Sequence, residues 1–300
     1  MRAAITGARG FVGRHLAAHL TARGAIVVEL DVDGSKPLDI TDRDAVVRRV
    51  ADERPDALFH LAARSHVGTS WGAGDELTRV NVDGTRAVLD ACVAAGVARV
   101  LVVGSAEQYG AVTADELPVR ETTPLRPITP YGESKVAAEA VARDAHREHG
   151  LAVVSARAFN HTGPGQAPTF LVPGLAARIV AAEREGRDEI ALGNGDPVRD
   201  FSDVRDVVRA YALLAERGTA GAAYNVCSGN GVRVGDLAAD LVARSTRSLR
   251  ITTSEDLVRL VDVPVMVGDN TELVAATGWE PEFDLARTLD DVLVAARAGG

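Results

Sequence analysis

Short runs of apolar, mostly β-branched residues alternate with longer amphipathic segments through the first half of the chain. Such runs predict buried strands, and a period of 3.6 residues between apolar positions predicts helices. Because strands and helices alternate, we expect βαβ units and an α/β fold with a Rossmann-type, doubly wound parallel sheet. The predicted strands cover residues 3–6, 26–30, 57–60, 100–103 and 152–158, and the predicted helices cover 11–22, 43–53, 75–95 and 131–149.

The pattern changes from Asn160 onward, where glycine and proline cluster in HTGPGQAP and GNGDP and the apolar runs become short. Such clusters mark turns and loops rather than long helices. We therefore predict a dinucleotide-binding domain over residues 1–159 and a smaller mixed α/β lobe over 160–300 that binds the substrate, with later segments returning to the first domain. The alanine-rich helices over 75–95 and 131–149 present small residues that fit either a homodimer interface or packing on the sheet.

Composition and charge narrow the class of protein. The 300 residues carry a net charge of −9, and the acidic residues are scattered among arginines, so the basic stripe that a nucleic-acid partner requires is missing. The N-terminus does not resemble a signal peptide, and no run reaches the roughly 20 apolar residues of a membrane span. We expect a cytoplasmic protein without a membrane partner. The two cysteines and the spaced histidines form no ligand pattern, so we predict no disulfide and no metal site.

Three glycines stand in ITGARGFVGRHL, directly after a predicted strand and at the start of a predicted helix. Gly7, Gly10 and Gly13 allow the backbone to turn tightly and approach a pyrophosphate, which the free N–H groups of the helix terminus attract. Phe11 and Val12, inside the same loop, are included in the predicted cofactor site. The spacing is GxxGxxG, and a tight turn without a ligand is the alternative explanation.

An acidic residue ends the second predicted strand, about twenty residues beyond the glycines. Asp31 is placed to accept hydrogen bonds from the adenosine ribose, which favours NAD(H), whereas Arg9 in the glycine loop offsets the charge and keeps NADP(H) open. Further cofactor contacts are predicted after the second and third strands. These residues are Asp39 and Ile40, followed by Leu61, Ala62 and Ala63 of LFHLAA, a segment that a buried strand would also explain.

A tyrosine and a lysine lie four residues apart in TPYGESKVAAE, so one face of a helix carries both. The phenol of Tyr131 becomes a usable acid or base if the Lys135 ammonium favours the phenolate. The chain has 31 arginines but only two lysines, so a lysine here suggests a need for a compact ammonium. Ser105 follows the apolar strand VLVVG and is placed to bind a substrate carbonyl. Glu107 is either a second acid or a solvated loop residue.

In order and spacing, these motifs and Asn81 resemble the extended short-chain dehydrogenases over nearly the whole chain. Longer strings in the second half resemble one family within them, the GDP-4-keto-6-deoxy-D-mannose reductases. These strings are RAFNHTGPGQ, RDFSDVRDVVRAY, YNVCSG and VDVPVMVGDNTEL. The resemblance implies an NAD(P)H-dependent reductase of the C4 keto group of GDP-4-keto-6-deoxy-D-mannose that forms GDP-D-rhamnose or GDP-6-deoxy-D-talose.

The resemblance also implies roles for individual residues. It makes Ser105, Tyr131 and Lys135 the catalytic set, with Phe159 near the cofactor and Asn160 near the substrate diphosphate. The other implied substrate contacts are Ser65, Arg199, Arg259 and Asp262. Two positions depart from the family pattern, since Leu260 stands where proline is expected and Arg64 where glutamine is usual.

Three other functions remain open from the sequence. A GDP-mannose 4,6-dehydratase uses a hydroxyl residue and a glutamate two positions later, a spacing that Ser105 and Glu107 share. A nucleotide-sugar 4-epimerase is a weaker alternative. A dinucleotide-sensing regulator without catalysis would be free to lose Tyr131 or Lys135, and both are present.

Overall fold

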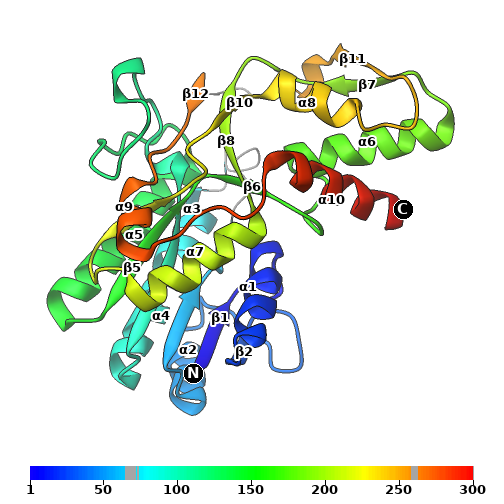
Figure 1. Cartoon of the computed structure of the whole chain (residues 1–300). Coiled ribbons are helices and arrows are strands. Elements are labelled where there is room, and N and C mark those ends of the chain that lie inside the picture. The colour runs from blue at the N-terminus through cyan, green and yellow to red at the C-terminus, as the bar shows by residue number, and fades with distance from the viewer. Residues whose placement is uncertain (65–71, 73, 258–262, 300) are drawn as a thin grey trace.

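The computed structural model describes residues 1–64, 72, 74–257 and 263–299. Its centre is a six-stranded parallel sheet in the order β2-β1-β3-β4-β5-β9 (Figure 1). The prediction of an α/β fold with a doubly wound parallel sheet is therefore confirmed. The strands are β1 (Arg2–Thr6), β2 (Ile26–Leu30), β3 (Ala57–His60), β4 (Arg99–Ser105), β5 (Val153–Ala158) and β9 (Ala223–Val226).

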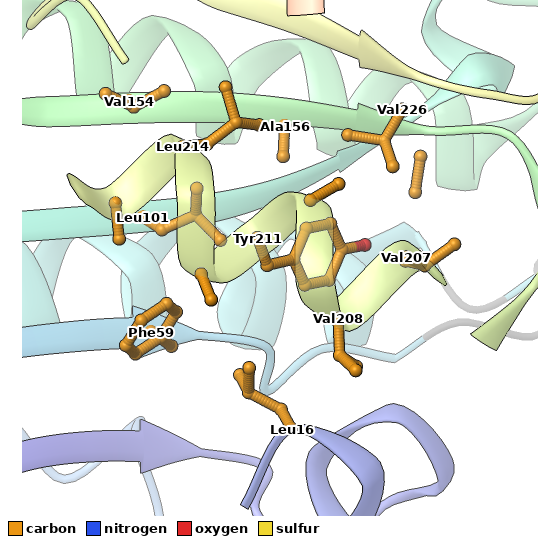
Figure 2. Packing of buried hydrophobic residues seen from close by; sticks show 14 of the residues in the cluster. Leu16, Phe59, Leu101, Val154, Ala156, Val207, Val208, Tyr211, Leu214 and Val226 are labelled. Atoms are coloured by element: carbon orange, nitrogen blue, oxygen red, sulfur yellow. The ribbon is translucent and has the colours of Figure 1, made fainter. Parts of the chain in front are cut away.

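Helices cover both faces of this sheet, which is why its central strands are apolar on both sides. In β4, Leu101 packs into a cluster with helices of one face, while Val100 and Val102 pack into a second cluster on the other. Figure 2 shows the first cluster, with the side chains of α7 lying against the strands. The first face carries α1 (Phe11–Ala22) and α7 (Val204–Arg217), and the second carries α2 (Arg43–Glu53), α4 (Gly84–Ala95) and α5 (Pro130–His149).

Most predicted elements of the first half are found within one or two residues of their expected ends, and the main difference is the helix expected over 75–95. This segment is α3 (Gly74–Leu77), a π-helical turn η1 (Thr78–Asp83) and then α4. The wider turn brings Asn81 into the interior, where it is 1% exposed and hydrogen-bonded. Such π-helical turns often mark functional sites.

A smaller lobe lies over the carboxyl edge of the sheet (Figure 1). In it β8 pairs with three short strands, and a separate two-stranded sheet packs with three helices around a third apolar cluster. The lobe's elements are β6 (Asn160–Thr162), α6 (Leu171–Glu185), β7 (Glu189–Leu192), β8 (Val198–Asp203), β10 (Gly231–Arg233), α8 (Val234–Val242), β11 (Arg250–Thr253), β12 (Val265–Met266) and α10 (Leu285–Ala298).

The chain passes back from the lobe to the first sheet, where α7, β9 and α9 (Thr271–Thr277) pack with the first domain's strands and helices. The indole of Trp279 is 1% exposed in this cluster and donates to the Asp206 carbonyl at 3.0 Å. The Asp206 carboxylate accepts the N–H groups of Glu282 and Phe283 at 2.9 and 3.0 Å. These bonds fix the point at which the chain leaves the sheet for α10.

Candidate active site

A cavity of about 800 Å³ lies at the carboxyl ends of the parallel strands. This is where open α/β sheets bind ligands, because the loops that follow the strands converge there. Every predicted site residue that the structure describes lines this cavity. They are Gly7, Gly10, Phe11, Val12, Gly13, Asp31, Asp39, Ile40, Leu61, Ala62, Ala63, Ser105, Glu107, Tyr131, Lys135, Phe159, Asn160 and Arg199. The predicted substrate contacts Ser65, Arg259 and Asp262 lie outside the described residues.

The glycine loop leaves room for a pyrophosphate, because it turns tightly and its glycines carry no side chains. Gly7 has a φ of +69°, and its N–H donates to the Leu30 carbonyl at 2.9 Å. A Cβ on Gly13 would lie 2.1 Å from the Gly7 carbonyl oxygen, and a Cβ on Gly7 would lie 2.9 Å from the Ala62 nitrogen. Gly10 caps α1 without a side chain, so the positive end of the helix dipole faces the cavity.

Asp31, at the end of β2, lies beside Arg9 of the glycine loop. Asp31 accepts the Arg9 N–H at 2.8 Å, and the Arg9 guanidinium pairs with Glu29 at 3.1 Å. The carboxylate is thus held toward the glycine loop, while the arginine charge is shared with another acid. Both groups line the cavity or its rim, which is consistent with either NAD(H) or NADP(H).

The predicted contacts after β2 differ in their surroundings. The Asp39 carboxylate accepts from the backbone and hydroxyl of Thr41, both at 2.9 Å, and the backbone bond is the main reason that its pKa is lowered. Ile40 is buried, and its Cδ1 would lie 2.7 Å from a Cβ on Gly84. The close approach of α4 therefore depends on glycine at position 84.

A buried chain of hydrogen bonds holds the end of β3. The Thr85 hydroxyl donates its one proton to the Asn81 carbonyl at 2.7 Å. The Thr85 oxygen must therefore accept the hydrogen bond from Nε2 of His60 at 2.8 Å. Nδ1 of His60 then accepts from Thr6 at 2.7 Å. Burial, together with the charge of Lys135, lowers the pKa of His60 to about 3, so the ring is neutral. Within LFHLAA the histidine is thus a core residue, and the three residues after it line the cavity.

The π-helical turn joins this loop to helix α5. The Asn81 amide oxygen accepts the Arg64 N–H at 2.8 Å, and its nitrogen donates to the Arg64 carbonyl at 3.1 Å. The same nitrogen donates to Ser134 Oγ at 2.9 Å, and Ser134 donates to the Tyr131 carbonyl at 2.7 Å. One side chain therefore fixes the first turn of α5 relative to the end of β3.

Helix α5 presents the tyrosine and lysine on one buried face. Thr129 caps the helix by accepting the Gly132 N–H at 3.0 Å, and Pro130 begins it. Lys135 Nζ lies 6.0 Å from the centre of the Tyr131 ring and donates to the Val103 carbonyl at 2.7 Å. Ser105 is close enough to the Tyr131 phenol to lower its pKa through hydrogen bonding. The three groups that the sequence analysis selected thus lie together, at the end of β4.

Burial dominates the protonation of both ionisable groups. It raises the pKa of Tyr131 to about 12, against the opposing hydrogen bond from Ser105, and the charge of Glu107 raises it further. Burial lowers the pKa of Lys135 to about 8. The predicted effect of the lysine ammonium, which favours the phenolate, is opposed by burial and by the charge of Glu107, and the phenol stays protonated. Tyr131 therefore holds a proton that it can donate.

A buried polar network supports the loop that carries Ser105. The Ser105 N–H donates to the side chain of Gln108 at 2.8 Å, and Gln108 donates to Glu139 at 2.8 Å. Glu139 in turn forms a two-pronged ion pair with Arg157 at 2.8 and 2.6 Å, with both side chains under 10% exposed. Glu107, next to Gln108, is half-buried and lines the cavity rather than standing in solvent.

Several cavity residues were not selected from the sequence. His161 donates from Nδ1 to the Phe159 carbonyl at 2.9 Å, and its ring lies parallel to that of Phe11 with centroids 6.3 Å apart. His161 follows Asn160 directly and begins the sequence HTGPGQ, and this position could have identified it as a site residue. Tyr211 gave no such signal, because it lies on the apolar face of a helix and is typical of a core residue. Gln166, Phe170 and Met266 are further examples.

The cysteines are part of the apolar interior. Cys92 and Cys227 are both buried and are free thiols, and burial raises the pKa of Cys92 to about 12. Within the described ranges, no group of three or more His, Cys, Asp or Glu residues is arranged to hold a metal ion. None of the helices described is long and apolar enough to cross a bilayer.

Comparisons with known proteins show the family and the fold. The model of the NAD dependent epimerase/dehydratase family matches residues 3–227. The GDP-6-deoxy-D-mannose reductase of Pseudomonas aeruginosa is 34% identical over 292 residues, covering 96% of this chain and 95% of the relative. The solved structure of RMD from Pseudomonas aeruginosa complexed with NADPH has a TM-score of 0.90, 32% identity and 99% coverage of both chains. The UDP-glucose 4-epimerase of Thermus thermophilus in complex with NAD has a TM-score of 0.89, 27% identity and full coverage of both chains.

Replacing Gly13 by alanine should weaken both the fold and dinucleotide binding, because the new Cβ would meet the Gly7 carbonyl at 2.1 Å. We expect a loss of about 1–3 kcal/mol in the free energy of unfolding, typical of overpacking, and a higher Kd for NADH and NADPH. Urea unfolding and nicotinamide fluorescence measure the two effects. Gly74→Ala is the control, since no atom of the described residues lies within 4 Å of its Cβ position. Equal behaviour of the two variants would contradict the role of Gly13.

Replacing Lys135 by methionine should stabilise the protein most at neutral pH. The pKa of Lys135 is about 8 in the folded protein against 10.5 unfolded, so between these values the unfolded state binds more protons and stability rises with pH. We expect Lys135→Met to gain roughly 3 kcal/mol at pH 7, and roughly half of that or less at pH 9.5. Urea unfolding at several pH values measures this, with Lys36→Met as the exposed-lysine control. A difference independent of pH would refute the shift.

Proposed function

The chain belongs to the NAD dependent epimerase/dehydratase family, and on that premise we propose that it reduces the C4 keto group of GDP-4-keto-6-deoxy-D-mannose. The product would be GDP-D-rhamnose or GDP-6-deoxy-D-talose, and the cofactor is NAD(H) or NADP(H). Similarity to a GDP-6-deoxy-D-mannose reductase over nearly the full length of both chains supports this activity and the guanine base.

The observation that carries the proposal is the convergence of Ser105, Tyr131 and Lys135 in the cavity that the glycine loop also lines. When bound, the reduced nicotinamide supplies the hydride that C4 accepts. Tyr131 donates its proton to the carbonyl oxygen, so that the ketone becomes an alcohol. Ser105 donates a hydrogen bond to the same oxygen as negative charge develops on it. The Lys135 ammonium stabilises the phenolate that Tyr131 becomes.

The remaining cavity residues fit a charged substrate with hydroxyl groups. We propose that Asn160 and Arg199, on the lobe side of the cavity, contact the sugar diphosphate, since a guanidinium matches phosphate oxygens with forked hydrogen bonds. On the ground of the family resemblance, we propose that Ser65, Arg259 and Asp262 also contact the substrate. Small and apolar residues on α5, Val136, Ala137 and Ala140, are half-buried, and we propose that α4 and α5 form a homodimer interface.

A 4,6-dehydratase is the second candidate, because Ser105 and Glu107 both line the cavity. Glu107 is close enough to Tyr131 for its charge to raise the pKa of the phenol. A carboxylate there suits removal of a proton from the sugar ring. The same carboxylate in a reductase would keep Tyr131 protonated until the keto oxygen accepts the proton.

One assay separates the two activities. The protein is incubated with GDP-4-keto-6-deoxy-D-mannose and either NADH or NADPH, and separately with GDP-mannose. A reductase oxidises one nicotinamide per keto sugar consumed, which absorbance at the reduced-nicotinamide band measures. Release of a keto sugar from GDP-mannose without net cofactor use would replace the reductase assignment by the dehydratase. Dinucleotide binding without either reaction would instead indicate a regulator.

Replacing Tyr131 by phenylalanine should remove the proton donor and leave the ring in place. We expect kcat for keto-sugar reduction to fall by about 10²–10⁴-fold, the usual contribution of general acid catalysis, with the Kd for the cofactor within a few-fold of the wild type. Steady-state kinetics and fluorescence titration measure the two. Tyr224→Phe is the control, because its hydroxyl accepts the Thr219 N–H at 3.0 Å and it does not line the cavity. Unchanged turnover of Tyr131→Phe would remove this residue from the mechanism.

A further inference from the structure

Tyr211 is a tyrosine within the apolar core whose hydroxyl is left without a partner. It lies on α7 and is 0% exposed, in the cluster formed by α1, α7 and the central strands. Among the residues that the structure describes, no atom forms a hydrogen bond with its oxygen. A buried hydroxyl without a partner destabilises a fold, and phenylalanine would fill the same space without that cost.

The residue that carries this unpaired hydroxyl lines the cavity. Three other side-chain atoms in the described ranges are buried and unpaired, in Arg49, Arg178 and Ser202, and none of these residues lines the cavity, whereas Tyr211 does. Figure 2 shows its ring lying in the core, with the oxygen directed toward the carboxyl ends of the strands. The oxygen is therefore directed toward the edge of the sheet at which the cavity lies.

Two observations indicate which end of the cavity lies near Tyr211. Burial raises the pKa of Tyr211, and the nearby Tyr131 phenol raises it further, so the two hydroxyls are within electrostatic range. Helix α7 also packs against α1, whose N-terminus carries the glycine loop. Tyr211 thus lies on the glycine-loop face of the sheet, near the proposed proton donor. Asp31 is distant from it along the sheet edge, because β1 and β3 stand between β2 and β4.

We propose that Tyr211 is a cofactor-binding residue whose hydroxyl forms a hydrogen bond with the nicotinamide half of a bound pyridine dinucleotide. This rests on the proposed function, which places the nicotinamide beside Tyr131. A phenol both donates and accepts, so it suits a carboxamide, which offers one acceptor and two donors. Binding then satisfies a group that the folded protein alone leaves unpaired.

The test compares two phenylalanine variants that each remove one oxygen atom from the same core cluster. Tyr224 is the matched control, because it is 5% exposed, accepts the Thr219 N–H at 3.0 Å and does not line the cavity. For each protein, the Tm without added dinucleotide is measured by calorimetry, and the Kd for NADH and NADPH by fluorescence titration. Neither measurement depends on turnover.

The two variants should respond in opposite ways. We expect Tyr211→Phe to keep or raise the Tm and to increase the Kd of the preferred dinucleotide about tenfold, as loss of one buried hydrogen bond does. We expect Tyr224→Phe to lower the Tm and to leave the Kd unchanged. An unchanged Kd in Tyr211→Phe, with wild-type protein that binds, would overturn this inference alone. Wild-type protein that binds neither NADH nor NADPH would overturn the proposed function as well.

Discussion

The parallel register of the central sheet is the constraint on which the rest of the structure depends. Six parallel strands send every following loop to the same edge, and the order β2-β1-β3-β4-β5-β9 opens a crevice where the strand order reverses beside β1. The glycine loop, Asp31 and Ser105 reach one cavity only for this reason. The lobe then covers that edge from above (Figure 1). The fold thus places the candidate site, and the chemistry of the loops defines what it binds.

Buried polar contacts give this edge a single arrangement. Asn81 joins the loop after β3 to the first turn of α5 through Ser134, and Gln108 joins the loop after β4 to the ion pair of Glu139 and Arg157. A buried network in which the members satisfy one another is rigid, because loss of one member leaves the others unpaired in a medium of low dielectric constant. The positions of Ser105 and Tyr131 are therefore set by residues that do not enter the cavity.

Desolvation decides the charge state of the site. His60 is neutral, the pKa of Tyr131 is raised and the pKa of Lys135 is lowered, each with burial as the largest cause. Burial thus disfavours the charged form of each group, so that at neutral pH the histidine and the phenol are neutral while the lysine is still an ammonium. A proton donor of this kind suits the reduction of a ketone, in which the oxygen gains negative charge as C4 accepts hydride.

The sequence by itself determined the local features of this protein: the βαβ order, the bounds of several strands and helices, the glycine loop and the shared face of Tyr131 and Lys135. Each depends on spacing along a few consecutive turns or strands, which periodicity reports directly. Only the tertiary structure decided the π-helical turn at Asn81, which of the later segments return to the first sheet, namely α7 and β9, and the pKa directions. It also decided that Tyr211, which looks like any core residue on an apolar helix face, reaches the cavity. These features arise from burial and from contacts between distant segments, and no local pattern of residues encodes how far a side chain lies from solvent.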